Sequence, residues 1–557
     1  MKRSLFIACL CASALAGPAV GQPTSVLMPG VTYEREVEFT PHGPVVAHVI
    51  QAPRPRGLYS LQPVTARDAV LGKDRLTAIE KRLSPTATVA AVNGGLFTGA
   101  GRPDGLFLQG GIMHTQPTGD RSSLGIDAGG TLSVDRVPFF GDWRGVGPRR
   151  GLSGVNDQVG PNGTVLFTSS WPGATPAAGD AVEAVLSTFP TATPNTDLTG
   201  TVSALLQGGR HTVPPGSAIL YARGNAAARV AAEAAVGSPL TVRMILPSPF
   251  ATAVAGIGGG PLLVKNGRPV FRANEAFQPS WLIPRIARTA VGQRADGGIL
   301  LVAVDGGRAA YSVGMTNFEL AQELARLGAV TAMGLDSGAS TTMAFEGDLL
   351  NKPSGPERPI ADALAVLYSG VQAPPPTRDV LSPNGDGAGD RQTLAYKLVR
   401  PSTVSAVLLG PGGSRIELDS GARSPGSYRF TWRGRDDRGA VLPEGRWTWN
   451  VSVVDDQGRT SEAERPFSLN ATLKGIAVSG SRITVDLARP ANLTLRIERS
   501  GAVLRTLLKR QVGGGTTSVT WDGRLNARLR APRGPYVVRA TATNSIGTMD
   551  LTATVRR

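Results

Sequence analysis

The chain has 557 residues, too many for one hydrophobic core, so roughly two to four domains are expected. Its formal net charge is +16, and aromatic residues make up only 5% of the sequence. Such a charge favours anionic partners, but the sequence has no dense basic run with interleaved aromatic residues, so we expect no nucleic-acid binding.

Residues 1–21 have the pattern of a secretory signal peptide. Lys2 and Arg3 precede the apolar run Leu5–Leu15, and small residues follow this run. The run is too short to cross a bilayer, so we expect no membrane span and a secreted protein that is extracellular, periplasmic or held at the cell surface. Both cysteines lie inside this segment, so the mature chain is expected to have no disulfide and no thiol nucleophile.

The next part of the chain alternates short β-like runs with glycine and proline turns. Val31–Val64 contains several such runs, Thr88–Val92 is a further strand, and helical patterns occur at Arg67–Leu83 and Ala226–Ala235. The segment Ala255–Val264 is rich in glycine, but a strand and a hairpin turn follow it rather than a helix. A dinucleotide-binding interpretation therefore fails, and we expect a close approach of this backbone to a ligand or another strand.

The most informative pattern lies in the middle of the chain. The apolar run Ile299–Val304 predicts a strand that ends at Asp305, and a capping box that begins at Thr316 predicts a helix. A second apolar strand, Ala329–Leu335, ends at Asp336. A strand–helix–strand crossover of this length normally joins neighbouring parallel strands with a right-handed connection.

The two strand-ending aspartates are therefore expected to lie side by side. Paired strands are about 4.8 Å apart, and α/β proteins usually place ligands at the carboxyl edge of a sheet. Adjacent carboxylates in glycine-rich loops indicate catalysis or cation binding. The alternative is that Asp305 and Asp336 each merely end a strand with an Asx turn.

Beyond residue 370 the pattern changes to short alternating strands with glycine turns. Residues 371–378 are rich in proline and predict a stiff linker. A repeat then follows, because Phe-Thr-Trp432-Arg-Gly recurs as Val-Thr-Trp521-Asp-Gly. The repeat predicts two all-β immunoglobulin-like sandwiches at residues 379–469 and 470–557, with both tryptophans in equivalent core positions.

The terminal modules resemble the immunoglobulin-like modules of flagellar hook-cap and other bacterial surface proteins. The resemblance includes the entry sequence Ser-Pro-Asn384-Gly-Asp386-Gly-Ala-Gly-Asp390. The alternating oxygen side chains of Asn384, Asp386 and Asp390 could bind Ca²⁺. The alternative is a polar, Asx-rich turn.

Between residues 91 and 343 the chain carries a series of short, mostly glycine-rich motifs. They are Ala91-Val-Asn93-Gly94-Gly-Leu-Phe97, Gly258-Gly-Gly-Pro-Leu-Leu263, Ala287-Arg288-Thr289-Ala-Val-Gly292, Val304-Asp305-Gly306, Gly314-Met315-Thr316 with Glu319-Leu-Ala321, and Leu335-Asp336-Ser337-Gly338-Ala-Ser340-Thr341-Thr-Met343. Together and in this order they resemble the phosphodiester glycosidase family, and the resemblance extends over about residues 30–370.

The resemblance implies hydrolysis of a sugar-1-phosphodiester, such as an N-acetylglucosamine-1-phosphate diester, in a phosphorylated glycan or an anionic wall polymer. We expect an α+β catalytic domain with a mixed sheet at residues 22–370. Asp305, Asp336 and Arg288 are the catalytic candidates. The substrate-binding candidates are Asn93, Gly94, Thr289, Gly306, Thr316, Ser337, Gly338, Ser340 and Thr341.

The chain departs from the family pattern at two places. The usual Leu-Asp-Gly-Gly-Gly-Ser is Leu-Asp336-Ser337-Gly338-Ala-Ser340 here, and the usual Asp-Gly-Arg gains a residue as Asp305-Gly-Gly-Arg. Both departures touch the expected pocket, so they bear on which sugar and which aglycone fit.

A glycosyl phosphodiester already carries a stable phosphate leaving group. Its hydrolysis therefore chiefly needs a cation for the phosphate and a carboxylate for the sugar carbon or for water. Arg288 could offer a bidentate fork to phosphate, or could form a surface salt bridge. Carboxylates about 5 Å apart would indicate retention and about 6.5–9.5 Å inversion. If Asp305 and Asp336 instead bind a metal ion, they neutralise charge.

Smaller choices stay open at two positions. Asn93 could hydrogen-bond to sugar or phosphate, or could form an Asn-Gly turn. Glu319 is expected to cap a helix rather than to catalyse.

Two other functional classes compete with the glycosidase. Asp336-Ser337-Gly338 resembles the loop of aspartic proteases, but such enzymes need two loops that share a proton, and the loop at Asp305 lacks the hydroxyl residue. A non-enzymatic surface adhesin or glycan-binding protein is favoured by the β-modules but not by the glycine-rich acidic loops. Convergence of Arg288 with both aspartates on one cleft would favour the enzyme.

Overall fold

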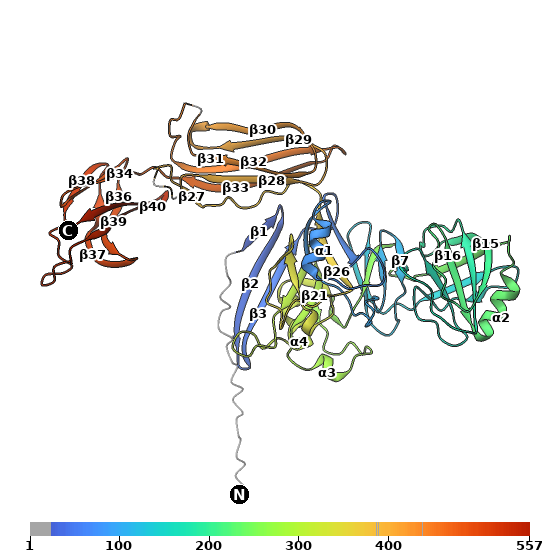
Figure 1. Cartoon of the computed structure of the whole chain (residues 1–557). Coiled ribbons are helices and arrows are strands. Elements are labelled where there is room, and N and C mark those ends of the chain that lie inside the picture. Colours follow the sequence, from blue (N-terminus) through green and yellow to red (C-terminus); the bar gives the residue numbers. More distant parts are fainter. Residues whose placement is uncertain (1–23, 386, 388, 437) are drawn as a thin grey trace, which may run out of the picture. The chain divides into compact units, whose positions relative to one another are not determined.

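The computed structural model describes residues 24–557 except 386, 388 and 437, so the expected signal peptide lies outside the described residues (Figure 1). Two compact units meet between Tyr368 and Ser369. Among the described residues, no helix has the length and apolar character needed to cross a membrane. The fold is mostly β, and nearly all strand pairs are antiparallel.

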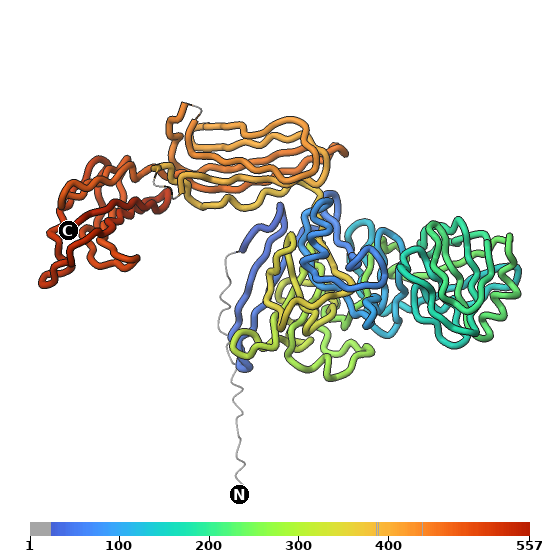
Figure 2. Tube along the Cα trace, viewed as in Figure 1, coloured from blue at the N-terminus to red at the C-terminus, as the bar shows by residue number. Residues whose placement is uncertain are grey.

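The first unit is built on an eight-stranded antiparallel sheet, called sheet I. Strands from the start of the unit lie beside strands from its later part, joined by the pair β3–β22, as the blue and yellow parts of the tube in Figure 2 show. In spatial order its strands are β1 (Ser25–Met28), β2 (Val31–Thr40), β3 (Gly43–Ala52), β22 (Ile299–Val304), β21 (Arg288–Arg294), β23 (Ala329–Gly334), β19 (Leu262–Lys265) and β20 (Arg268–Pro269).

Two five-stranded sheets complete the core of this unit. Sheet II consists of β25 (Asp348–Leu349), β24 (Met343–Phe345), β5 (Thr88–Asn93), β26 (Asp362–Tyr368) and β4 (Tyr59–Thr65). Sheet III consists of β7 (Ile112–Thr115), β6 (Phe107–Gln109), β18 (Ala253–Gly258), β8 (Ser123–Asp127) and β9 (Leu132–Asp135).

Helices cover the outer faces of sheets I and II. The inner faces share one apolar core, which includes Val291, Leu301, Val92 and Leu364. On the other face of sheet I lies α4 (Asn317–Arg326), and on the other face of sheet II lies α1 (Leu76–Leu83). The order of layers is therefore helix, sheet, sheet, helix, and it follows from strands that are apolar on both faces.

A second eight-stranded sheet, sheet IV, is inserted between β9 and β18. Its strands in spatial order are β11 (Arg150–Gly151), β10 (Phe140–Arg144), β17 (Pro239–Ile245), β15 (Asp197–Gln207), β14 (Ala181–Ser187), β16 (Ala218–Arg223), β13 (Thr164–Thr168) and β12 (Gly154–Val155). Helix α2 (Gly224–Glu233) packs on this sheet, and its bounds agree within two residues with the helix predicted at 226–235.

The expectation of an α+β domain with a mixed sheet overestimated the helix content. Besides α1, α2 and α4, the described part of the first unit has only the four-residue α3 (Pro279–Leu282) and the 3₁₀ turn η1 (Gly338–Ser340). The predicted helix at 67–83 shrinks to α1, because residues 66–71 form a turn and a bend instead of helix. In this unit the single parallel pair among the described strands is β12 with β13.

The predicted adjacency of the two strand-ending aspartates is wrong. The capping box at Thr316 and the crossover β22–α4–β23 are present. However, β21 lies between β22 and β23 and pairs antiparallel with both. The two strands are therefore two interstrand spacings apart, roughly 10 Å. The reason is that β21, which directly precedes β22 in the chain, forms a hairpin with it and occupies the neighbouring place.

The second unit contains two β-sandwiches, as the repeat predicts. In the first, a five-stranded sheet of β27 (Val380–Leu381), β33 (Thr460–Leu469), β32 (Gly445–Asp455), β29 (Ser402–Leu409) and β30 (Arg415–Arg423) faces the pair β28 (Gln392–Leu398) and β31 (Gly426–Trp432). In the second, β34 (Leu473–Ser479), β35 (Arg482–Leu487) and β38 (Gly515–Thr520) face β37 (Ala502–Val512), β36 (Ala491–Arg499), β39 (Pro535–Asn544) and β40 (Gly547–Arg556).

The repeated tryptophans occupy equivalent core positions, which confirms that prediction. Trp432 is 5% exposed and Trp521 is 3% exposed. Trp432 contacts the Trp447 ring, and Trp521 contacts the Tyr536 ring at the corresponding place of the second sandwich.

The segment 371–378 is only partly a free linker. Val371 and Ala373 are fully buried in the core of the first sandwich. Gln372 exchanges two backbone hydrogen bonds with Lys397, and the Nε of Arg465 donates to the carbonyl of Ala373 at 2.6 Å. The apolar residues at the start of the segment therefore belong to the sandwich, and the prolines that follow are more exposed.

Candidate active site

The glycine-rich motifs meet where sheets I and II come together, and the side chain of Asn93 joins them. Asn93 is fully buried at the end of β5. Its Nδ2 donates to the carbonyl of Asp336 at 2.8 Å. Its Oδ1 accepts hydrogen bonds from the Thr289 hydroxyl at 2.7 Å and from the Thr342 amide at 3.1 Å. These partners use most of its hydrogen-bonding capacity, so Asn93 orients the loop that follows β23.

Asp336 lies in that loop and is 7% exposed. Its Oδ1 accepts the Ser337 amide at 2.9 Å. Burial raises the pKa of the Asp336 carboxyl, while hydrogen bonds from Ser340 and Ser337 and the positive charge of Arg358 oppose the rise. Asp336, Ser337 and Ser340 are all predicted site residues, and the structure brings the three together.

A second carboxyl group, which the sequence analysis missed, lies close to Asp336. Asp362 is the first residue of β26 and is 2% exposed. Its Oδ1 accepts the Gly95 amide at 2.8 Å, and its Oδ2 has no hydrogen-bond partner among the described residues. Burial raises the pKa of Asp362 to about 8, and the negative charge of Asp336 adds to the rise. Asp362 therefore keeps its proton at neutral pH.

The Asn-Gly-Gly motif is explained by this carboxyl group. A Cβ atom on Gly94 would lie 1.8 Å from Oδ1 of Asp362, and one on Gly95 would lie 2.2 Å from the carbonyl oxygen of Gly258. Only glycine permits so close an approach at either position. Gly94 thus makes room for the Asp362 carboxyl. The predicted close backbone approach at Ala255–Val264 is also found here, because Gly258 ends β18.

The positive charge of Arg358 acts on Asp336. This arginine was not predicted from the sequence either. It is exposed, and its Nη1 donates to the Ser340 hydroxyl at 3.0 Å. The guanidinium lies 5.1 Å from the centre of the Phe97 ring. Among the described residues no carboxylate forms an ion pair with it, so the fork remains available to an anionic ligand.

The structure places Arg288 among backbone carbonyl groups. It is fully buried, and burial lowers its pKa to about 10, so it is charged at neutral pH. Its guanidinium donates to backbone carbonyls of Met315, Trp281, Leu282 and Pro284. With these partners it cannot present a fork to a phosphate group. It anchors the loop around α3, and phosphate binding by Arg288 stays a prediction that these hydrogen bonds do not favour.

Asp305 is also satisfied by the protein. Its carboxylate is 1% exposed and accepts hydrogen bonds from the Tyr311 hydroxyl at 3.0 Å, the Asn351 amide group at 3.0 Å and the Lys352 backbone at 3.1 Å. Nε2 of His48 lies 2.9 Å from it. Asp305 is therefore the centre of a buried polar network.

His48 was not singled out by its sequence pattern, because it stands alone in an apolar strand. Its Nδ1 lies 2.8 Å from the Tyr33 hydroxyl, which also donates to the carbonyl of Leu350. Burial raises the pKa of Tyr33 to about 12. The network of Tyr33, His48 and Asp305 holds the segment 350–352 against sheet I.

The remaining predicted site residues have mainly local roles. Gly306 packs against the backbone of Ala287, since a Cβ would lie 2.3 Å from its nitrogen. Thr316 caps α4 together with Glu319, as expected. Gly338 donates its amide to Ala287 and adopts a positive φ of 67°. Thr341 is buried, and its hydroxyl has no hydrogen-bond partner among the described residues.

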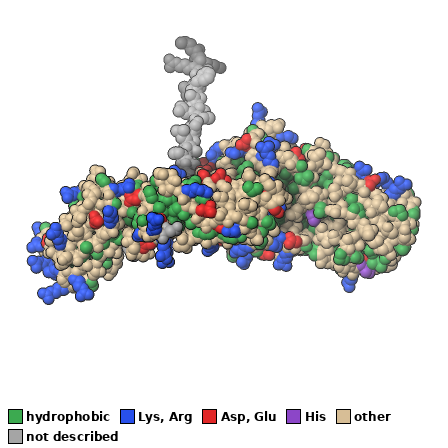
Figure 3. Space-filling view, turned by 90° about the horizontal axis from the view of Figure 1, so that it is seen from above, with side chains coloured by type: hydrophobic (Ala, Val, Ile, Leu, Met, Phe, Trp, Pro, Cys, Tyr) green, Lys and Arg blue, Asp and Glu red, His purple; other side chains and the backbone are tan. Residues whose placement is uncertain are grey.

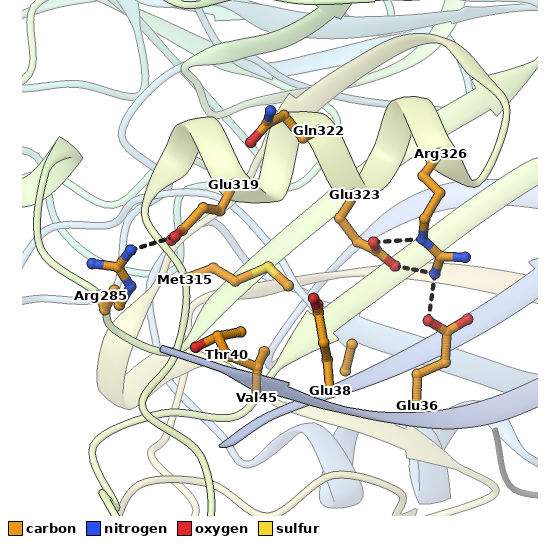
Figure 4. Close-up of a pocket in the computed structure, with 11 residues that line it drawn as sticks. Glu36, Glu38, Thr40, Val45, Arg285, Met315, Glu319, Gln322, Glu323 and Arg326 are labelled. Carbon is orange, nitrogen blue, oxygen red and sulfur yellow. Dashed lines mark hydrogen bonds and ion pairs between the residues drawn. The ribbon is translucent and has the colours of Figure 1, made fainter. Parts of the chain in front are cut away.

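A separate acidic pocket of about 560 Å³ lies between β2, β3 and α4 (Figure 4). Glu319 points toward Arg285, and Arg326 bridges Glu323 and Glu36. These ion pairs involve three of the four glutamates that line the pocket, and they fix α4 on sheet I.

The predicted Ca²⁺ site is only partly described. Asp386 lies outside the described residues. Both carboxylate oxygens of Asp390 accept backbone amides, from Gly385 and Gly387 at 2.7 Å each. The surrounding pocket is lined by the arginines Arg378, Arg391, Arg433 and Arg435. This arrangement favours the alternative of an Asx-rich turn, and Ca²⁺ binding stays a prediction.

Comparison with known proteins agrees with the motifs. Residues 193–367 match the family model described as phosphodiester glycosidase. The uncharacterized protein YomE, derived from the SPbeta prophage of Bacillus subtilis strain 168, is 35% identical over 112 residues, which are 20% of this chain and 17% of YomE. The match therefore spans less than a fifth of that relative.

Two further comparisons cover larger shares. The basal-body rod modification protein FlgD of Salmonella typhimurium is 25% identical over 186 residues, which are 32% of this chain and 75% of FlgD. The crystal structure of a hypothetical protein from Synechocystis has a TM-score of 0.54 and 25% identity, over 64% of each chain. Both resemblances read from the sequence are thus found, the flagellar one in part.

Proposed function

We propose, from the phosphodiester glycosidase family domain that this chain contains, that it hydrolyses a sugar-1-phosphodiester in a glycan or cell-wall polymer. In this reaction the bond between the sugar C1 and the phosphate oxygen breaks. Water adds to C1, and a phosphate monoester leaves. The substrate class, the export and the activity itself are parts of the proposal.

The pair of buried carboxyl groups carries this proposal. Burial raises both pKa values, and the charge on Asp336 raises that of Asp362 further, to about 8. Two neighbouring carboxyl groups, of which one keeps a proton, are a common arrangement for acid–base and nucleophilic work. Asp336 takes the ionised role, toward the sugar carbon or the attacking water. Asp362 keeps its proton and is neutral, so Asp336 is the member of the pair that carries the negative charge.

Arg358 is the proposed phosphate ligand. Its guanidinium is exposed, unpaired with any carboxylate of the described chain, and tied to the Asp336 loop through Ser340. A planar fork suits two phosphate oxygens. Because phosphate is already a stable leaving group, this cation contributes more than a strong general acid would. Arg288 supports the site indirectly by anchoring the loop around α3.

The test uses the purified protein and a small diester. In this diester, phosphate joins C1 of N-acetylglucosamine to O6 of methyl mannoside. Free N-acetylglucosamine is measured by mass spectrometry, with and without a chelator. Arg358→Gln should lower kcat/KM about 100-fold, on the scale of losing one preorganised electrostatic partner. Arg229→Gln, which removes an exposed arginine on α2, is the matched control and should change it less than twofold.

The outcomes separate the candidate functions. Absence of sugar release from this diester and from its mannose and glucose analogues would refute the hydrolase proposal and favour a glycan-binding protein. Cleavage that is lost with the chelator would add a metal ion to the site. Peptide cleavage that pepstatin inhibits would favour the protease.

A further inference from the structure

The net positive charge of the protein is concentrated in the second β-sandwich. Residues 470–557 contain 15 basic and 4 acidic side chains, a net charge of +11 out of +16 for the whole chain. The first sandwich, at 379–469, contains 12 basic and 12 acidic side chains and is neutral. Two modules of one fold in one chain differ by 11 charges, so a general arginine bias of the sequence does not explain the difference.

The charges gather at one end of this sandwich, around the loop 521–534. In Figure 3, Lys and Arg side chains crowd the part of the surface that belongs to β36–β40, the red elements of Figure 1. We define the basic end as the surface formed by six arginines: Arg499, Arg524, Arg528, Arg530, Arg533 and Arg557. All are exposed except Arg524, which is half-exposed.

Backbone contacts hold the basic end in place. Arg524 and Arg530 face each other in a β-bridge, and the amide of Leu525 donates to the carbonyl of Leu529. Arg557 exchanges two backbone hydrogen bonds with Gly534, and its side chain donates to the carbonyl of Ala531. The loop and the last residue of the chain therefore form one surface rather than separate arms.

Few acidic groups neutralise this surface. Asp522 lies in the same loop, but it pairs with Arg505 at 2.6 Å. Glu498 pairs with Arg539. Every residue of 470–557 is described, and none of the six arginines of the basic end forms an ion pair with a carboxylate. Like charges at this density repel one another, so the arrangement favours an anionic ligand that neutralises several of them together.

The surface fits a polysaccharide better than a nucleic acid or a membrane. Single-stranded nucleic acids need exposed aromatic side chains for stacking. The two aromatic residues of this sandwich, Trp521 and Tyr536, are 3% and 1% exposed. A membrane-binding surface needs an apolar patch, whereas Leu529 is the one large apolar side chain exposed in the loop 521–534.

We propose that the basic end binds an anionic polysaccharide that carries phosphate or sulfate groups. The side chains of Arg499, Arg524 and Arg557 each donate one hydrogen bond to the protein. Arg528, Arg530 and Arg533 are exposed and can each offer a bidentate fork to such oxyanions. Several guanidinium groups at one end match a polymer rather than a single ion. The choice of a glycan rests on the proposed function. A polymer held by this sandwich is kept at a high effective concentration for the catalytic unit of the same chain.

The test measures binding of the full-length protein to dextran sulfate, with unsulfated dextran of equal length as the ligand control. The variant carries Arg528→Gln, Arg530→Gln and Arg533→Gln, whose side chains make no contact that the fold needs. The matched control carries Arg415→Gln, Arg429→Gln and Arg446→Gln, which remove the same charge from exposed positions of the first sandwich. Binding is followed between about 50 and 200 mM NaCl, where counterion release changes affinity strongly.

The wild-type protein should bind dextran sulfate and not dextran. The variant should bind at least tenfold more weakly, with a salt slope smaller by about 2, while the control stays within twofold. Equal losses in both variants would refute the site. Tighter binding to duplex DNA, or to vesicles containing phosphatidylglycerol, than to dextran sulfate would refute the polysaccharide. Because dextran sulfate is not a sugar-1-phosphodiester, this result does not depend on hydrolysis, which the small diester tests separately.

Discussion

Two buried carboxyl groups of the first unit differ in the groups that stabilise their negative charge. Asp336 is contacted by two serines and lies near the positive charge of Arg358, whereas Asp362 has one amide partner and an oxygen that nothing contacts among the described residues. Burial disfavours both charges, but two hydrogen bonds and a nearby positive charge oppose this effect at Asp336, whereas a single backbone hydrogen bond opposes it at Asp362. These contacts favour the negative charge on Asp336 and the proton on Asp362.

Replacing Asp336 by Asn should abolish most of the activity without unfolding the protein. Asn keeps an oxygen for the Ser337 amide but removes the charge that the reaction needs. We expect kcat/KM on the small diester to fall at least ~100-fold. Circular dichroism and the urea midpoint should stay near the wild-type values. Asp305→Asn is the comparison, because it weakens a structural network and should lower the urea midpoint instead.

Replacing Asp362 by Asn should change how stability depends on pH. The pKa of Asp362 is raised from 3.8 to about 8, so between these values the folded protein holds a proton that the unfolded chain has lost. Stability from this group is thus complete at low pH and falls as pH rises toward 8, by about 1.4 kcal/mol per pH unit. Asn is neutral throughout, so the variant should lack this part of the decline.

The measurement is urea unfolding at pH 5, 6, 7 and 8 for wild type and variant. Burial also raises the pKa of Glu80 well above its usual range. Since Glu80 is present in both proteins, its contribution cancels in the difference. Parallel stability curves for the two proteins would show that Asp362 does not hold a proton at neutral pH.

At the scale of elements, Arg288 joins a strand of sheet I to the loop around α3. Four backbone carbonyls converge on its guanidinium. Lysine keeps the charge but lacks the planar fork, so Arg288→Lys should free residues 279–284. We expect chymotrypsin to cleave near Trp281 at least ~10-fold faster, which corresponds to a loss of about 1.4 kcal/mol in local stability.

The neighbouring Arg285→Lys is the matched control, because Arg285 pairs with Glu319 at the surface. Its cleavage rate should stay within twofold of wild type. If Arg288→Lys left cleavage unchanged and raised only the KM for the diester, Arg288 would contact substrate, as the motif first suggested.

The elements of this site were predictable in part. The strands at 299–304 and 329–334 and the capped helix between them follow from periodicity and caps. The strands that pair with them could not be predicted, because a strand that precedes β22 in the chain can pair on either side of it. Asp362 gave almost no pattern: it is one acid at the start of an apolar run. Its importance depends on the packing of Gly94 across sheet II.

In the whole molecule, the net positive charge lies mostly in the second β-sandwich, whereas the first sandwich is neutral. The uneven charge is visible in the sequence once the repeat fixes the boundaries of the modules, although the total of +16 conceals it. The end of the first unit was less predictable. Proline-rich composition indicated a linker, but the burial of Val371 and Ala373 depends on a core that only the folded sandwich provides.

A chain that ends at Gly370 should therefore be a better catalytic fragment than one that ends at Thr377. The longer fragment exposes Val371 and Ala373, which the first sandwich normally buries, and should aggregate more readily. The shorter fragment should hydrolyse the small diester with kcat/KM within about threefold of the full chain. It should also lose dextran sulfate binding. These expectations follow from compact units with separate cores. Complete loss of activity in a folded fragment ending at Gly370, checked by circular dichroism, would mean that the sandwiches contribute to the active site.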